Sequence, residues 1–80
     1  VALCNEYNFS DGELVIEAWK KLGLGPVVGK RTGGGEVGSG GGYRLKDGGS
    51  VYVPNYAAFD FEKQKWVIEG YGATPTVEVD

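Results

Sequence analysis

A serine that directly precedes an amphipathic segment is the residue in this chain best placed to do chemistry. Ser10 lies between an apolar run at residues 1–4 and a helical pattern that starts at Asp11. At the N-terminus of a helix, free backbone N–H groups meet the positive end of the helix dipole, and an oxyanion needs this environment. A serine hydroxyl here suits a nucleophile, with the amide of Asp11 as a donor to the oxyanion.

Ser10 also has a simpler structural explanation. Glu13 follows it three residues later, and Ser-x-x-Glu is the capping-box pattern that begins many helices. Such a cap stabilises a helix by about 1 kcal/mol and implies no chemistry. From the local pattern alone, capping is the better supported role of Ser10.

A glycine-rich stretch is the second chemical candidate. Gly33, Gly35 and Gly38 match the G-x-G-x-x-G spacing of dinucleotide-binding loops. Such a loop needs a helix that begins within the motif, so that its amides and dipole meet the pyrophosphate. Here the motif continues into residues 39–42, Ser-Gly-Gly-Gly, which cannot begin a helix. In a segment so rich in glycine the match is expected by chance, and we reject a nucleotide site.

The composition excludes several other functions. The chain has 80 residues, with eight Lys and Arg against eleven Asp and Glu, a net charge of −3, and both signs are scattered along it. We therefore expect no basic surface for nucleic acid. No segment approaches the roughly 20 apolar residues of a membrane span. The chain contains no His, the commonest general base and metal ligand, so its chemistry must draw on residues from elsewhere.

The first part of the chain predicts a strand, a helix and a second strand. Residues 1–4 form an apolar run typical of a buried strand, in which the lone Cys4 is expected to be a buried, unreactive thiol. Over residues 11–22 the apolar side chains follow a helical period and define one stripe, composed of Leu14, Val15, Ala18, Trp19 and Leu22. Gly23 marks the end of this helix, and residues 27–28 form the next strand. This order is typical of an α/β unit with a parallel crossover.

The second half of the chain predicts β structure. Residues 43–46 and 51–53 flank an Asp-Gly-Gly turn, the pattern of a β-hairpin. The glycine-rich residues 33–42 before it predict a mobile hairpin tip or a surface loop. Further strands are expected at residues 66–68 and, as an edge strand, at residues 76–79. We therefore expect a β-meander in this half.

Three segments of the chain resemble the tail-specific protease family, and within it the tricorn-type serine proteases. They are residues 7–13 (Tyr-Asn-Phe-Ser-Asp-Gly-Glu), 29–32 (Gly-Lys-Arg-Thr) and 69–75 (Glu-Gly-Tyr-Gly-Ala-Thr-Pro). Further matches lie between these segments. The order and spacing of the matching residues therefore resemble the family over nearly the whole chain. It implies a crotonase-type α/β fold, of which this chain supplies one helix packed on a mostly β framework.

The resemblance also implies roles for individual residues. Ser10 would be the catalytic serine, and the backbone N–H of Asp11 one donor of the oxyanion hole. Glu69 would be the carboxylate that orients the catalytic histidine through an intervening serine, and both of those partners would lie upstream of this chain. Relatives with a serine–lysine dyad carry their lysine at the position of Gly35, so the resemblance disfavours a dyad.

The chain departs from the family pattern at two positions. Gly33 stands where an aromatic residue commonly follows Gly-x-Arg-Thr, which predicts a looser wall beside the site. Thr76 stands where an acidic residue often follows the proline, which puts only a terminal contact in doubt.

The sequence thus predicts that residues 1–80 are the C-terminal portion of a serine protease catalytic domain, incomplete and inactive by itself. The implied substrate is a peptide or unfolded polypeptide, cleaved through an acyl-enzyme, and no metal or organic cofactor is implied. The expected partners are the upstream part of the same domain and further copies in a homo-oligomer, because unpaired strand edges promote self-association. The alternative is a non-catalytic peptide-binding or interaction module in which Ser10 only caps its helix. The compartment stays open, since a lone cysteine is compatible with the cytosol and with the cell envelope.

Overall fold

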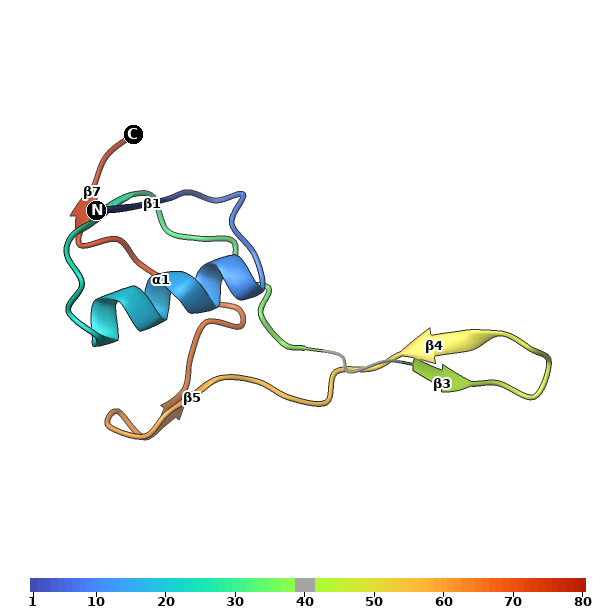
Figure 1. The fold of residues 1–80 in the computed structure, drawn as a ribbon. Coiled ribbons are helices and arrows are strands. Elements are labelled where there is room, and N and C mark those ends of the chain that lie inside the picture. The colour runs from blue at the N-terminus through green and yellow to red at the C-terminus, as the bar shows by residue number, and fades with distance from the viewer. Residues whose placement is uncertain (39–41) are drawn as a thin grey trace.

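The computed structural model describes residues 1–38 and 42–80. One helix and a small sheet form a rounded part, and a hairpin projects from it (Figure 1). The extents along the three principal axes are 50, 28 and 18 Å, and the long axis reflects this hairpin. Within the described residues, no helix has both the length and the apolar character needed to cross a membrane.

A three-stranded parallel sheet lies on one side of the helix. β1 (Ala2–Cys4) pairs with β2 (Val27–Gly29), and β2 pairs with β7 (Val77–Glu78), which gives the order β1-β2-β7. The helix α1 (Asp11–Lys21) connects β1 to β2, so the predicted parallel crossover is confirmed. β7 lies at an edge of this sheet, as predicted for the last strand.

Thr76 fastens β7 to β2. Its hydroxyl accepts the Val27 N–H at 2.9 Å and donates to the Val27 carbonyl oxygen at 3.0 Å, and its own N–H donates to that carbonyl at 2.8 Å. An ionised acidic side chain could accept the first of these bonds but could not donate the second. Thr76 departs from the family pattern, but its hydroxyl therefore stabilises the pairing of β7 with β2.

The helix begins and ends as predicted, but its buried face differs from the prediction. Gly23 follows the last turn at φ 63°, in the left-handed region that favours glycine. Ile16 and Glu13 are the buried residues of α1, whereas Leu14 and Val15 from the predicted stripe are 44% and 58% exposed. Much of the apolar stripe is therefore open to solvent in this chain.

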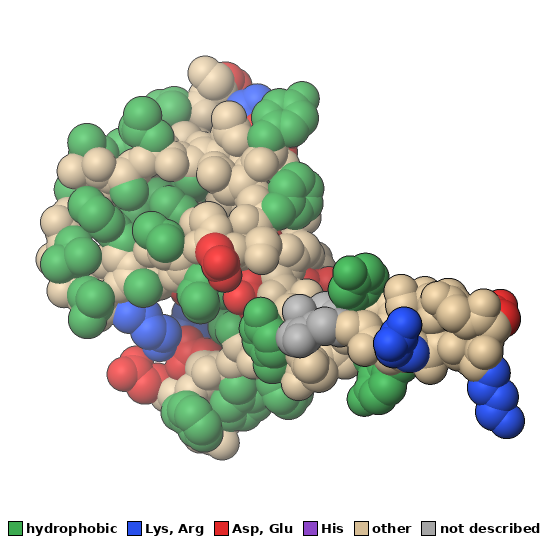
Figure 2. All heavy atoms as spheres, turned by 45° about the vertical axis from the view of Figure 1, so that its right-hand side comes forward, with side chains coloured by type: hydrophobic (Ala, Val, Ile, Leu, Met, Phe, Trp, Pro, Cys, Tyr) green, Lys and Arg blue, Asp and Glu red, His purple; other side chains and the backbone are tan. Residues whose placement is uncertain are grey.

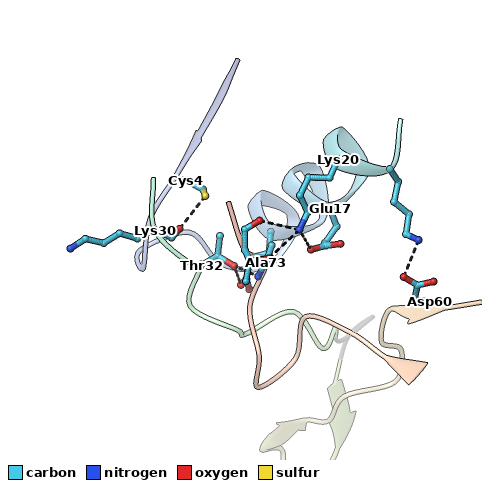
Figure 3. A network of polar contacts seen from close by, with 10 residues as sticks. Cys4, Glu17, Lys20, Lys30, Thr32, Asp60 and Ala73 are labelled. Carbon is cyan, nitrogen blue, oxygen red and sulfur yellow. Dashed lines mark hydrogen bonds and ion pairs between the residues drawn. The ribbon is translucent and has the colours of Figure 1, made fainter. Parts of the chain in front are cut away.

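The hydrophobic core is small. It contains Cys4, Ile16, Val27 and Ala73, with Ala2 and Trp19 packed against it. Cys4 is buried as predicted, its Sγ donates to the Lys30 carbonyl oxygen at 3.1 Å (Figure 3), and burial raises the pKa of the thiol. Leu3 is 74% exposed, so the prediction of a continuously buried first strand is wrong.

The second half forms two separate hairpins, so the prediction of one meander is wrong. β3 (Gly42–Arg44) pairs with β4 (Ser50–Tyr52) around the predicted glycine turn. β5 (Phe59–Asp60) pairs with β6 (Lys65–Trp66). Each pair is a sheet of its own, and the first pair projects from the molecule (Figure 1) with both strands exposed.

Residues 33–38 of the glycine-rich segment form a connection and not a hairpin tip. Its residues 33–38 are irregular and end at Gly38, which is bridged to Tyr56, while residues 39–41 lie outside the described part of the chain. The turn of the first hairpin lies instead between β3 and β4. Of the two predictions for this segment, the loop is therefore right for residues 33–38.

An ion pair fastens the β5–β6 hairpin to the end of α1. Lys21 Nζ lies 2.9 Å from Asp60 Oδ2 (Figure 3), and Asp60 Oδ1 accepts the N–H groups of Glu62 at 2.9 Å and Lys63 at 3.1 Å. Asp60 is only 4% exposed. The bond from Lys21 first, and then those from the backbone, hold the pKa of the Asp60 carboxyl below its ordinary value of 3.8.

We expect Asp60→Asn in the complete protein to loosen this hairpin. A carboxylate whose pKa is lowered by folding stabilises the folded state above its ordinary pKa, and the effect is lost as the pH falls through the folded-state value. Hydrogen exchange of residues 59–66 should therefore be faster in the variant at neutral pH, and the difference should shrink below pH 3.8. Glu62→Gln is the control, because the Glu62 carboxylate lies 3.9 Å from Lys21 and is 90% exposed. Equal exchange in the two variants would contradict the anchoring role of Asp60.

Candidate active site

Two asparagines order the turn that presents Ser10. The Asn5 N–H donates to Asn8 Oδ1 at 2.8 Å, the Tyr7 N–H donates to Asn5 Oδ1 at 2.9 Å, and the Asn8 N–H donates to the Asn5 carbonyl oxygen at 3.0 Å. Asparagine side chains close loops in this way because they mimic backbone groups. The bonds fix the path from β1 to α1 and place Ser10 directly before the helix, as predicted.

The backbone of Ser10 is strained. Its φ of 54° and ψ of −125° lie in a region that residues other than glycine rarely adopt. The Ser10 N–H donates to the Gly35 carbonyl oxygen at 2.9 Å and to Glu13 Oε2 at 3.2 Å, and these bonds hold the turn. A serine on a sharp, strained turn between a strand and a helix is also the geometry of the nucleophile elbow of α/β-hydrolases.

The Ser10 hydroxyl and the Asp11 amide come from adjacent residues at this turn. Ser10 and Glu13 form the predicted capping box at the start of α1, and the Glu13 N–H donates to the Ser10 carbonyl oxygen at 2.9 Å. The Asp11 N–H has no acceptor among the same residues, as is usual for the first amides of a helix. A hydroxyl beside an unbonded amide is the pair that an acyl-transfer site needs.

The segments that contain the three family-like motifs meet in space. The Thr32 hydroxyl donates to the Glu13 carboxyl group, which joins the second motif to the first, and the N–H of the next residue, Gly33, donates to the Asn8 carbonyl oxygen at 2.9 Å. The Thr32 N–H donates to the Ala73 carbonyl oxygen at 2.9 Å, and the Ala73 N–H donates to Thr32 Oγ1 at 2.7 Å (Figure 3). These bonds join the second motif to the third, so residues far apart in sequence form one region.

Glu69 lies in this region and is held by one of its two oxygens. Its Oε2 accepts the N–H of Glu36 at 2.6 Å and that of Val37 at 2.7 Å. These two bonds, that from Val37 first, lower the pKa of the Glu69 carboxyl below its ordinary value. Among the residues that the structure describes, no donor is bonded to Oε1. The carboxylate is thus fixed in place with one oxygen open to a partner.

Three buried polar residues of this region were not recognised as site residues in the sequence. Glu13, Thr32 and Glu36 are 0%, 2% and 5% exposed. Glu13 and Thr32 lie in the family-like motifs, and this position was the signal that could have identified them. Nothing in the sequence distinguishes Glu36. Burial first, and then the charges of Asp11, Glu13 and Glu69, raise the pKa of the Glu36 carboxyl. The surroundings of Ser10 are therefore acidic, although the described residues contain no group of His, Cys, Asp and Glu arranged to hold a metal.

The ring of Phe9 fills the space beside Gly33. A Cβ atom at Gly33 would overlap the Phe9 ring, and one at Gly35 would lie 3.1 Å from it. No side chain therefore fits at residue 33 while the ring keeps this position. The prediction of a looser wall is wrong, because the aromatic ring comes from the residue before Ser10.

Comparison with known proteins gives the class of protein to which this region belongs. The model of peptidase family S41 matches residues 1–79, and the chain belongs to this family. It is 49% identical over 79 residues to tricorn protease homolog 1 of Streptomyces coelicolor, and 42% identical over 80 residues to the tricorn protease of Thermoplasma acidophilum. These matches cover 99% and 100% of this chain and 7% of each relative.

A solved structure agrees with this assignment. The crystal structure of the tricorn protease matches the fold with a TM-score of 0.84 and 41% sequence identity, over 98% of this chain and 8% of that one. The resemblance to tricorn-type proteases is therefore confirmed. The chain spans less than a tenth of the length of these relatives.

Proposed function

We propose that this chain is the C-terminal portion of a serine protease catalytic domain. Ser10 is the nucleophile, the N–H of Asp11 is an oxyanion-hole donor, and Glu69 is the orienting carboxylate. The observation that carries the proposal is the strained backbone of Ser10 at the start of α1, followed by an Asp11 N–H without an acceptor among the described residues. Membership of peptidase family S41 supports it.

The reaction needs two groups that the chain does not supply, a general base and the serine between that base and Glu69. Ser10 Oγ attacks the scissile carbonyl carbon of a peptide or unfolded polypeptide, while a histidine from outside the chain takes the hydroxyl proton. Glu69 orients that histidine through an intervening serine, and the Asp11 N–H stabilises the oxyanion. The histidine then gives its proton to the leaving amine as the peptide C–N bond breaks. In the second half the histidine takes a proton from water while the water oxygen attacks the ester carbon, and it returns that proton to Ser10 Oγ as the ester bond breaks. Each proton is accounted for without a metal or an organic cofactor.

The exposed apolar surface supports the proposal that the rest of the domain packs here. Hydrophobic side chains spread over the rounded part of the molecule (Figure 2). The exposed large apolar residues include Tyr7, Leu3 and Leu22, at 80%, 74% and 71%. Apolar surface of this kind marks a binding interface. In our proposal the upstream part of a crotonase-type α/β domain covers it, the chain alone is inactive, and the complete protein forms a homo-oligomer.

A fluorophosphonate probe tests the proposed function. The probe phosphonylates activated serines, so the complete protein should be labelled at Ser10, and mass spectrometry of its peptides would locate the label. The labelling should need the complete protein because its general base lies outside this chain. Absence of label at Ser10 in a protein that cleaves peptides would contradict the assignment.

We expect Glu69→Gln to lower the kcat of the complete protein, but by less than Ser10→Ala. Glutamine retains an oxygen that can accept the N–H groups of Glu36 and Val37, but it lacks the charge that orients and stabilises a histidine. A loss of up to roughly 10⁴-fold fits an orienting residue. Glu78→Gln, on the exposed strand β7, is the control and should leave kcat unchanged. No loss, or a loss equal to that of Ser10→Ala, would argue against the orienting role.

A further inference from the structure

Glu13 is more deeply buried and more heavily bonded than a helix-capping residue needs to be. Its side chain has 0% exposure, and it makes no ion pair within the described part of the chain. Four donors surround its carboxylate instead. Burial of a carboxylate is tolerated only where its oxygens are well hydrogen-bonded. These four hydrogen bonds therefore offset the cost of burying Glu13.

The four donors come from two segments of the chain. Oε1 accepts the Thr32 hydroxyl, and also the Gly34 N–H at 2.6 Å. Oε2 accepts the Gly35 N–H at 2.9 Å and the Ser10 N–H at 3.2 Å. Three donors thus belong to the loop after β2 and the fourth to the turn before α1. One side chain fastens the Ser10 turn to a loop that is distant in sequence.

The same loop contacts Ser10 a second time. The Gly35 carbonyl oxygen accepts the Ser10 N–H at 2.9 Å, while the Gly35 N–H donates to Glu13. A strained backbone conformation persists only where several interactions hold it in place. These two bonds hold the backbone of Ser10. The Ser10 N–H is occupied by the Gly35 carbonyl oxygen and by Glu13 Oε2, whereas the Asp11 N–H has no acceptor among the described residues.

We propose that Glu13 is a positioning residue of the acyl-transfer site. Its buried carboxylate holds the loop of residues 32–35 against the turn before α1, and thereby keeps Ser10 Oγ and the Asp11 N–H aligned for attack on a carbonyl group. The proposal rests on the proposed function, in which Ser10 is the nucleophile.

Thr32 extends this link to the segment of the orienting carboxylate. Its hydroxyl donates to Glu13 and accepts the Ala73 N–H at 2.7 Å. Ala73 lies in the motif that begins at Glu69. A change at Glu13 should therefore displace both the nucleophile and the segment that orients its base.

Glu13→Gln in the complete protein tests the proposal. Glutamine has nearly the same shape, but its amide nitrogen cannot accept a hydrogen bond, so the donors on one of its two terminal atoms lose their acceptor. We expect kcat per active site and the rate of fluorophosphonate labelling of Ser10 to fall about 10- to 100-fold, as misplacement of reacting groups by about 1 Å does. KM should change little, because Glu13 is buried and does not touch the substrate.

Matched variants at Thr32 and Glu17 complete the experiment. Thr32→Val removes the hydroxyl at nearly constant shape and should reproduce the loss, whereas Thr32→Ser keeps the hydroxyl and should restore the rates. Glu17→Gln is the control, because Glu17 lies one turn further along α1 and pairs with Lys20 at 2.9 Å (Figure 3). It should label and turn over at the unaltered rate.

Titration of the labelled serine separates a positioning role from a structural one. A structural role lowers the fraction of molecules that can be labelled and leaves the rate per labelled site unchanged, and that outcome would overturn the proposal. Unaltered rates in Glu13→Gln would overturn it as well, while labelling of Ser10 in the unaltered protein would leave the proposed function standing. If Ser10 of the unaltered protein is not labelled, the proposed function fails and this proposal with it. Should Glu13→Gln not fold, the Thr32→Val and Thr32→Ser pair decides.

Discussion

Ser10→Ala is expected to lower the kcat of the complete protein by on the order of 10⁶-fold, because the variant lacks the atom that forms the acyl bond. The helix should remain, with a loss of about 1 kcal/mol because Ser10 belongs to the capping box. Turnover of an unstructured peptide, with the fold followed by circular dichroism, measures both effects. Ser50→Ala is the matched control, because Ser50 lies on the exposed strand β4, and it should keep full activity.

A second substitution at the same position separates chemistry from backbone strain. Ser10→Gly also removes the hydroxyl, but glycine adopts φ 54° and ψ −125° without strain. Relief of a strained conformation is worth on the order of 1 kcal/mol, so Ser10→Gly should be inactive and more stable than Ser10→Ala. Normal turnover in either variant would remove the nucleophile role and leave Ser10 as a residue that only begins the helix.

Local sequence signals predicted the elements of the fold well. The Ser-x-x-Glu pattern and Gly23 gave the bounds of α1 because helix ends are determined by nearby backbone groups. The Asp-Gly-Gly turn gave the first hairpin for the same reason. Both features depend on residues that are neighbours in the sequence, so a single amino-acid sequence is enough to predict them.

The packing of these elements could not be predicted in the same way. Periodicity finds the apolar side of a helix, but it does not say which side meets the sheet of this chain. Here Ile16 meets the core while Leu14 and Val15 remain largely exposed. The prediction of a meander was wrong for a related reason. Strand pairing depends on contacts across the sheet and not on the order of the strands alone.

The residues of the candidate site could be predicted where they belong to a recognisable motif. Ser10, Asp11 and Glu69 came from the resemblance, and the structure brings the motifs that contain them together. The burial of Glu13 was not predictable, because glutamate side chains are normally exposed. Its burial follows from the amides of Gly34 and Gly35, whose positions depend on the folded loop.

Gly72→Ala is expected to damage the site strongly, although Gly72 is not among the groups proposed to react. Gly72 has φ 75°, and a Cβ atom there would overlap the Thr32 carbonyl oxygen and lie 3.1 Å from the Thr32 carbonyl carbon. The backbone of Thr32 must then move, which breaks its paired bonds with Ala73 and displaces its hydroxyl from Glu13. The strain at positive φ adds about 1–2 kcal/mol. We therefore expect loss of hydrogen-exchange protection at Ala73, together with a large fall in turnover.

Gly70→Ala is the matched control for this substitution, because it separates backbone strain from the overlap with Thr32. Gly70 lies two residues earlier with φ 78°, and a Cβ atom there would meet nothing within 4 Å. It should show only the strain of about 1–2 kcal/mol, with the amide of Ala73 still protected and most of the turnover retained. If the two alanine variants lose protection and turnover equally, strain alone explains the damage. The link from Glu13 through Thr32 to the Glu69 segment would then not be what holds the site together.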